Sequence, residues 1–169
     1  MSDPKSPKPL LRAADHDSLP ETSMSHPLNP ASLIRGRSLS DATGMKRVGL
    51  HLLRVAPGKE SFIYHSHQRE EEFVYILSGR GLAEIDGETY EVGPGDFMGF
   101  PTPSVAHHLK NPFEEDLVYL SGGERREVEI ADFPSVGKRG VRLGMQMTLY
   151  PIESAEPLSF KVETSPKKT

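Results

Sequence analysis

Short runs of β-branched and aromatic residues fill the chain between residues 48 and 149, and each run ends at Gly, Pro or Asp. The 169 residues include 15 Gly and 15 Pro, so turns must be frequent. Turn signals recur about every eight to twelve residues, which is typical of an all-β sandwich or barrel, and helical periodicity is nearly absent. This pattern predicts strands at 48–55, 62–65, 72–77, 82–85, 89–92, 96–100, 105–110, 117–120, 128–130 and 145–149.

The two ends of the chain differ from this central region. Residues 1–30 hold six prolines among Ser, Asp and Lys, and we expect them to form a flexible N-terminal arm. Residues 31–152 are predicted to form a single barrel domain, and residues 153–169 a C-terminal tail. Leu10, Leu11, Leu33 and Ile34 offer apolar surface, which together with unpaired strand edges predicts a homodimer.

Composition excludes several classes of function. The chain has no cysteine, so disulfides, thiolate metal ligands and cysteine nucleophiles are excluded. The formal net charge of −4 does not match the basic surface that a nucleic-acid-binding protein needs. No apolar run approaches the roughly 18 residues that span a bilayer. We therefore expect a cytoplasmic protein with neither nucleic acid nor membrane as partner.

Four of the seven histidines occur in two pairs, His65 with His67 and His107 with His108. Residues two apart on a strand project to the same face, so His65 and His67 can point at one spot inside a barrel. Glu72 shares a face with the apolar residues Val74 and Ile76 if 72–77 is a strand. An unpaired carboxylate inside a barrel would be costly, and a divalent cation bound to it would remove that cost. The pattern therefore indicates a metal site.

These residues resemble two short motifs of the cupin superfamily. The first motif comprises Gly58, His65, His67, Glu72 and Gly79, and the second comprises Gly95, Pro101, His107 and Asn111. Six residues, where the family has five, separate Gly58 from His65. Pro103 stands where the family has Gly, and one extra residue precedes the histidine of the second motif, so that His108 is a rival to His107.

The resemblance implies a double-stranded β-helix, also called a cupin or jelly-roll barrel, that binds one divalent transition metal per chain. Its ligands would be His65, His67, Glu72 and His107. Three imidazoles and a carboxylate suit Fe, Mn, Zn, Ni, Co or Cu, whereas calcium and magnesium prefer oxygen ligands. A six-coordinate metal would keep two positions for water or substrate.

The resemblance leaves two classes of function open. The first is a metal-dependent isomerase, dioxygenase, decarboxylase or lyase that acts on a small polar metabolite, such as a sugar or an organic acid. The alternative is a non-catalytic module that binds or senses a small molecule. Residues that could line the pocket are Tyr64, Tyr75, Phe97 and His108, with Tyr64 and His108 the nearest candidates for a general base. His51 is interpreted as a structural histidine.

Overall fold

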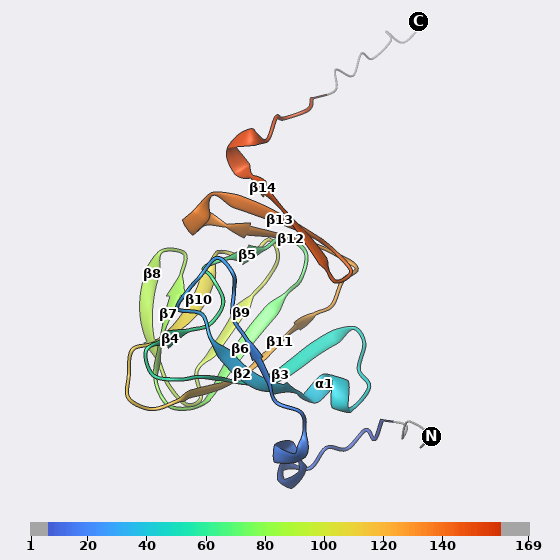
Figure 1. The fold of residues 1–169 in the computed structure, drawn as a ribbon, viewed down its shortest axis with the longest axis vertical. Coiled ribbons are helices and arrows are strands. Elements are labelled where there is room, and N and C mark those ends of the chain that lie inside the picture. Colours follow the sequence, from blue (N-terminus) through green and yellow to red (C-terminus); the bar gives the residue numbers. More distant parts are fainter. Residues whose placement is uncertain (1–6, 160–169) are drawn as a thin grey trace, which may run out of the picture.

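The computed structural model describes residues 7–159, and their strands form three antiparallel sheets (Figure 1). The first sheet has the order β1 (Thr22–Met24), β2 (Ile34–Ser38), β3 (Val48–Val55), β11 (Leu117–Glu124), β6 (Glu72–Ser78) and β9 (Phe97–Phe100). The second has the order β4 (Lys59–Glu60), β10 (His107–Asn111), β7 (Gly81–Ile85) and β8 (Glu88–Val92). The third has the order β14 (Gln146–Pro151), β13 (Lys138–Leu143), β12 (Val128–Phe133) and β5 (Ser66–His67).

Helices are short in the described part of the chain. They are η1 (Ala13–Ser18), α1 (Leu39–Ala42), η2 (Pro134–Val136) and η3 (Ile152–Ser154). None of them has the length and apolar composition that crossing a membrane requires. The architecture is therefore a jelly-roll barrel of strands, as the sequence pattern predicted.

The main hydrophobic core lies between the first and second sheets. Alternate residues of each strand face it, because successive side chains of a strand point to opposite faces. From the first sheet, Ile76 and Leu117 are fully buried, and from the second, Ala83 and Leu109 pack against them. A smaller cluster of Ile63, Ala131 and Phe133 joins the third sheet to the barrel.

Most predicted strands are present with boundaries shifted by a few residues, but the run 62–65 is not one of them. The short strand β5 follows it at Ser66–His67, and His65 forms only an isolated bridge to His107. The sequence also gave no signal for β1, β2, β4, β13 or α1. Strand β13 reads Lys-Arg-Gly-Val-Arg-Leu, so each of its faces carries a basic residue and it lacks the apolar face by which strands are recognised.

The predicted start of the domain at residue 31 falls inside the first sheet. Strand β1 pairs with β2 from Thr22 opposite Gly36 to Met24 opposite Ile34, so the sheet already begins within the predicted arm. Ile34, one of the residues expected to offer apolar surface to a partner, is fully buried in the core of its own chain. At the other end, η3 lies at the predicted boundary at 153, and residues 160–169 lie outside the described residues.

Candidate metal centre

The four predicted ligands converge inside the barrel. One nitrogen from each of His65, His67 and His107 and one oxygen from Glu72 lie within 4.8 Å of one another. Oε2 of Glu72 lies 3.1 Å from Nε2 of His67 and 3.4 Å from Nε2 of His107. Glu72 belongs to β6 of the first sheet, His107 to β10 of the second and His67 to β5 of the third, so that all three sheets contribute.

Two of the three imidazoles have their orientation fixed by backbone carbonyls. Nδ1 of His65 lies 2.7 Å from the carbonyl oxygen of Ile63, and Nδ1 of His107 lies 3.0 Å from that of Val105. A carbonyl oxygen only accepts hydrogen bonds, so each Nδ1 must carry the proton and donate it. The lone pair of each ring therefore lies on Nε2, the nitrogen that faces Glu72.

The third imidazole, that of His67, lies close to the ring of His65. Nε2 of His67 lies 3.1 Å from Nε2 of His65, whose Nε2 carries a lone pair. Two lone pairs at this distance would repel each other. Either Nε2 of His67 carries a proton and donates it to Nε2 of His65, or a cation binds both nitrogens. Phe100 stacks on the His107 ring, with ring centroids 3.6 Å apart and planes 5° apart, and fixes that side of the cluster.

Burial and charge set the protonation of these groups. Burial, aided by the neighbouring His67, lowers the pKa of His65 to about 3. Burial would also lower the pKa of His67, but its hydrogen bond to Glu72 and the charges of Glu72, Glu129 and Glu70 raise it above the ordinary value. Although burial opposes ionisation of Glu72, its polar contacts with His107 and His67 hold its pKa far below the usual range. The site thus holds an ionised carboxylate beside imidazoles that can offer lone pairs.

This arrangement fits a divalent transition metal. The donor set is three imidazole nitrogens and one carboxylate oxygen, which suits such ions and not calcium or magnesium. Metal-binding histidines generally donate their second ring nitrogen to a carbonyl or a carboxylate, as His65 and His107 do here. Glu72 is oriented in the same way, because the Ser121 hydroxyl donates to its Oε1 over 3.1 Å and leaves Oε2 for the cluster.

Two hollows meet at the cluster. One is an apolar cavity inside the barrel, and His65, Glu72 and His107 form part of its wall. The other is a polar opening of about 170 Å³, into which His67 and Glu72 also face. The remaining residues of the opening are Gly49, His51, Glu70, Glu71, Ser121, Gly122, Gly123, Glu124 and Arg125. A ligand could therefore reach the cluster through the polar opening.

Of the four predicted pocket residues, only His108 lines the apolar cavity. Its Nε2, however, lies 3.1 Å from Oε2 of Glu84, on the side of β10 away from the cluster. The Tyr64 hydroxyl accepts a hydrogen bond from the Gly87 amide, outside both hollows.

Tyr75 and Phe97 do not line the cavity. They face outward from β6 and β9, and 39% and 65% of their surface is exposed. Successive side chains of a strand point to opposite faces, so on β6 Glu72 and Val74 face inward and Tyr75 faces outward. On β9, Met98 and Phe100 likewise face the cavity, and Phe97 faces outward.

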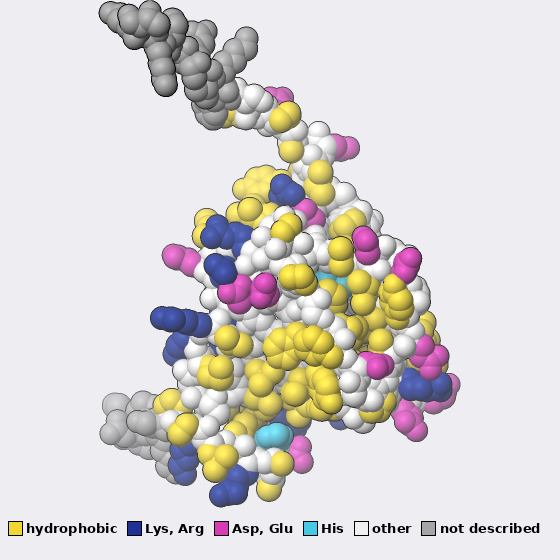
Figure 2. Space-filling model, turned by 180° about the vertical axis from the view of Figure 1, so that it is seen from behind, with side chains coloured by type: hydrophobic (Ala, Val, Ile, Leu, Met, Phe, Trp, Pro, Cys, Tyr) yellow, Lys and Arg dark blue, Asp and Glu magenta, His cyan; other side chains and the backbone are white. Residues whose placement is uncertain are grey.

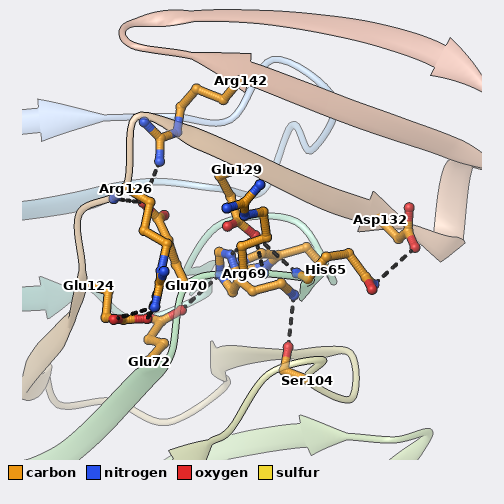
Figure 3. A network of polar contacts seen from close by, with 12 residues as sticks. His65, Arg69, Glu70, Glu72, Ser104, Glu124, Arg126, Glu129, Asp132 and Arg142 are labelled. Atoms are coloured by element: carbon orange, nitrogen blue, oxygen red, sulfur yellow. Dashed lines mark hydrogen bonds and ion pairs between the residues drawn. The ribbon is translucent and has the colours of Figure 1, made fainter.

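Three residues near the cluster were not among the predicted site residues. His51 lies in the polar opening on the same face of β3 as the buried Leu53, and Arg125 lies beside it. Glu129 of β12, labelled in Figure 3, is 2% exposed. Its Oε1 lies 3.4 Å from Nδ1 of His67. Glu129 alternates in phase with Ala131 and Phe133, the same signal of an inward carboxylate that identified Glu72.

Comparison with known proteins agrees with this architecture. The family profile of the cupin domain matches residues 51–122. A crystal structure from Acidithiobacillus ferrooxidans, provisionally named a sugar phosphate isomerase, is 37% identical and has a TM-score of 0.87, covering 90% of this chain and 98% of its own. A sugar phosphate isomerase of the cupin superfamily from Silicibacter pomeroyi is 25% identical with a TM-score of 0.76, covering 85% and 94%.

A curated relative matches a shorter stretch. An uncharacterised protein of Methanocaldococcus jannaschii is 39% identical over 57 residues, which are 34% of this chain and 45% of that relative. The match thus spans less than half of the relative's length. From its barrel, its two motifs and its likeness along nearly the whole chain to the Acidithiobacillus structure, the chain belongs to the cupin superfamily.

Proposed function

We propose that the chain is a metal-dependent isomerase that acts on a phosphorylated sugar. The observation that carries the proposal is the convergence of three imidazoles and one carboxylate at the inner end of a polar opening. The substrate class is supported by the two similar structures named as sugar phosphate isomerases. Because one fold hosts many reactions, the argument depends on the residues around the opening.

His65, His67, Glu72 and His107 would hold one divalent transition metal: Fe, Mn, Zn, Ni, Co or Cu. Such a cation supplies Lewis acidity, which polarises a carbonyl or hydroxyl oxygen of the sugar. The surrounding apolar wall of the barrel limits water around the reacting carbons, which strengthens the electrostatic contacts there.

Arg125 is the one Lys or Arg among the residues that line the opening, where it lies beside His51 and close to four glutamates. Its Nε and the Nε2 of His51 both lie near Gly49, at 3.1 and 3.2 Å from where a Cβ of that residue would be. Asp41 and Ser40 hold the Arg125 guanidinium through its terminal nitrogens, at 2.6 and 3.2 Å, so that the Nε–H stays available. We assign phosphate binding to this Nε–H, because arginine recognises phosphate through such charge-assisted contacts.

His51 is our candidate for the proton transfer. Interconversion of an aldose and a ketose moves one proton between adjacent carbons and one between the oxygens that they carry, with no oxidant and no leaving group. Burial and the charge of Arg125 lower the pKa of His51, so the imidazole is neutral at neutral pH and can take a proton and return it. This role replaces the structural interpretation of His51 and the base candidates Tyr64 and His108, since the Tyr64 hydroxyl contacts the Gly87 amide and Nε2 of His108 contacts Glu84.

The first experiment measures metal content by elemental mass spectrometry on the full chain, with Glu72→Ala and His67→Ala as variants. We expect about one transition metal per chain, lost in both variants. A wild-type chain that holds no metal and takes up none on titration would refute the metal-dependent function.

The second experiment follows a panel of aldose and ketose phosphates by proton NMR with metal-loaded protein. We expect interconversion that His51→Gln slows at least about 100-fold, within the range that a general base contributes. His16→Gln, a histidine of η1 remote from the opening, is the matched control. Sugar phosphate binding without turnover would instead favour the non-catalytic binding module.

We also propose that the chain forms a homodimer. Hydrophobic side chains gather over a wide area of the face seen in Figure 2. Among the exposed apolar side chains are Tyr75, Leu77 and Phe97 of the neighbouring strands β6 and β9. Contiguous apolar surface of this kind is typical of interaction sites, and a second copy of the chain is the partner that we propose.

A further inference from the structure

A buried carboxylate lies directly behind one of the predicted metal ligands. Glu129 of β12 is 2% exposed, and its Oε1 accepts hydrogen bonds from the backbone amides of Gln68 and Arg69, at 3.0 and 3.3 Å. The same oxygen lies 3.4 Å from Nδ1 of His67, and Figure 3 shows Glu129 between the third sheet and the cluster. Among the described residues, neither Lys nor Arg forms an ion pair with it.

Two buried polar atoms at this contact lack a hydrogen bond within residues 7–159: Nδ1 of His67 and Oε2 of Glu129. His67 can provide a donor and Glu129 an acceptor, because a protonated ring nitrogen donates a hydrogen bond and a carboxylate oxygen only accepts one. The His67 backbone is fixed by its amide, which donates to the Ser104 hydroxyl over 2.7 Å, and by its pairing with Ala131. Closing the 3.4 Å contact therefore needs only rotation of the ring and of the carboxylate.

We propose that Glu129 is a positioning residue for the metal centre. It accepts the Nδ1–H of His67 and so presents Nε2 to the metal, as the carbonyls of Ile63 and Val105 do for the other two histidines. This inference rests on the metal site of the proposed function, but not on the isomerase reaction. It also means that the third sheet, which lies mainly beyond the matched cupin domain at 51–122, completes the metal site.

The competing explanation is that Glu129 only holds the backbone turn at Gln68 and Arg69. The substitution Glu129→Gln separates the two roles. A glutamine oxygen in the place of Oε1 still accepts both backbone amides, but it carries no charge, so its contact with the Nδ1 proton of His67 is no longer charge-assisted. The neutral acceptor would raise the basicity of the imidazole less, so Nε2 should bind a metal more weakly.

The test is calorimetric titration of Zn²⁺ into the full-length wild type, Glu129→Gln and the control Asp132→Asn. Asp132 lies on the same strand and accepts from the Gln68 side chain, but does not contact His67. We expect Glu129→Gln to weaken Zn²⁺ binding about 10- to 100-fold, the usual effect of removing such a partner. Asp132→Asn should stay within about twofold of the wild type.

A second readout is the ¹H–¹⁵N NMR spectrum of the imidazoles in the zinc-loaded protein. In the wild type, the Nδ1 proton of His67 should be hydrogen-bonded and protected from exchange, and in Glu129→Gln its signal should move upfield and exchange faster, as expected of a weaker hydrogen bond. The wild-type signal alone decides the question if Glu129→Gln does not fold, because an unprotected proton would overturn the inference.

Other outcomes are equally decisive. Equal Zn²⁺ affinity of wild type and Glu129→Gln, or equal losses in Glu129→Gln and Asp132→Asn, would overturn the role of the carboxylate. A wild type that binds no metal would overturn this inference together with the proposed function. Normal metal binding without isomerase activity would refute only the proposed reaction.

Discussion

The Ser121 hydroxyl donates a hydrogen bond to Oε1 of Glu72 over 3.1 Å, and the other carboxylate oxygen is thereby directed at the imidazoles. Ser121 stands on β11, opposite Val74 of β6, so its hydroxyl reaches the carboxylate from the neighbouring strand. One serine from a strand that provides no ligand thus decides which oxygen of Glu72 faces the cluster.

Removal of that hydroxyl should therefore loosen the metal site. We expect Ser121→Ala to raise the metal dissociation constant about tenfold, since Glu72 would gain freedom to rotate. Titration calorimetry measures the effect, and Ser23→Ala, at an exposed position on β1, is the control. An affinity equal to that of the wild type would show that Glu72 is held by the histidines alone.

Metal affinity should fall as the pH is lowered through the titration of His67. The pKa of His67 is raised in the metal-free protein, so protons compete with the metal at this ligand first, beginning above pH 6.5. Below that pKa the affinity should drop about tenfold per pH unit, because one proton must leave for each metal bound. His65, with a pKa of about 3, does not compete in this range. Dissociation constants measured from pH 5 to 9 would contradict the assignment if they did not change.

Metal binding should stabilise the folded chain. A metal at 100 times its dissociation constant adds about 2.7 kcal/mol to the free energy of unfolding if only the native state binds it. For a domain of this size, the melting temperature should rise by about 5 to 10 °C. Thermal scans with and without a chelator measure this shift, and Glu72→Ala should show none. A similar rise in Glu72→Ala would mean that the metal binds elsewhere.

Two glycines in turns should differ in their tolerance of a side chain. Gly79 and Gly87 both have positive φ, +75° and +80°, but a Cβ on Gly79 would clash with the Asp116 carbonyl oxygen, whereas Gly87 has nothing within 4 Å. Gly87→Ala should cost about 1 kcal/mol from backbone strain alone. Gly79→Ala should cost several kcal/mol, because backbone must also shift. Urea unfolding of both variants gives the comparison, and equal losses would contradict it.

The proposed dimer should depend on the outer face of β6 and β9. Phe97, 65% exposed, stacks on Phe73 with ring centroids 6.0 Å apart. Phe97→Asp places a charge there and should convert a dimer to a monomer in light scattering. Met145→Asp, at an exposed position between β13 and β14, should remain dimeric. A monomeric wild type would refute the proposal.

The sequence predicted the barrel and the convergence of the four ligand candidates, because both depend on local patterns. Glu72 was recognisable because it alternates with Val74 and Ile76, and the choice of His107 over its neighbour followed from spacing and agrees with the cluster. Recognition failed where a strand lacks an apolar face, as in β13, and where partners are distant in the chain. Glu129 lies far along the sequence from His67, and no local pattern connects them.

The ligand candidates come from three separate sheets, and this gives the centre a role in the integrity of the barrel. A metal bound by Glu72, His67 and His107 would be a cross-link between the three layers, added to their side-chain packing and hydrogen bonds. Sliding or peeling of any one sheet would then have to break a coordination bond. The complete site exists only when all three sheets have docked, so a bound metal would stabilise the assembled barrel selectively over any partly folded form.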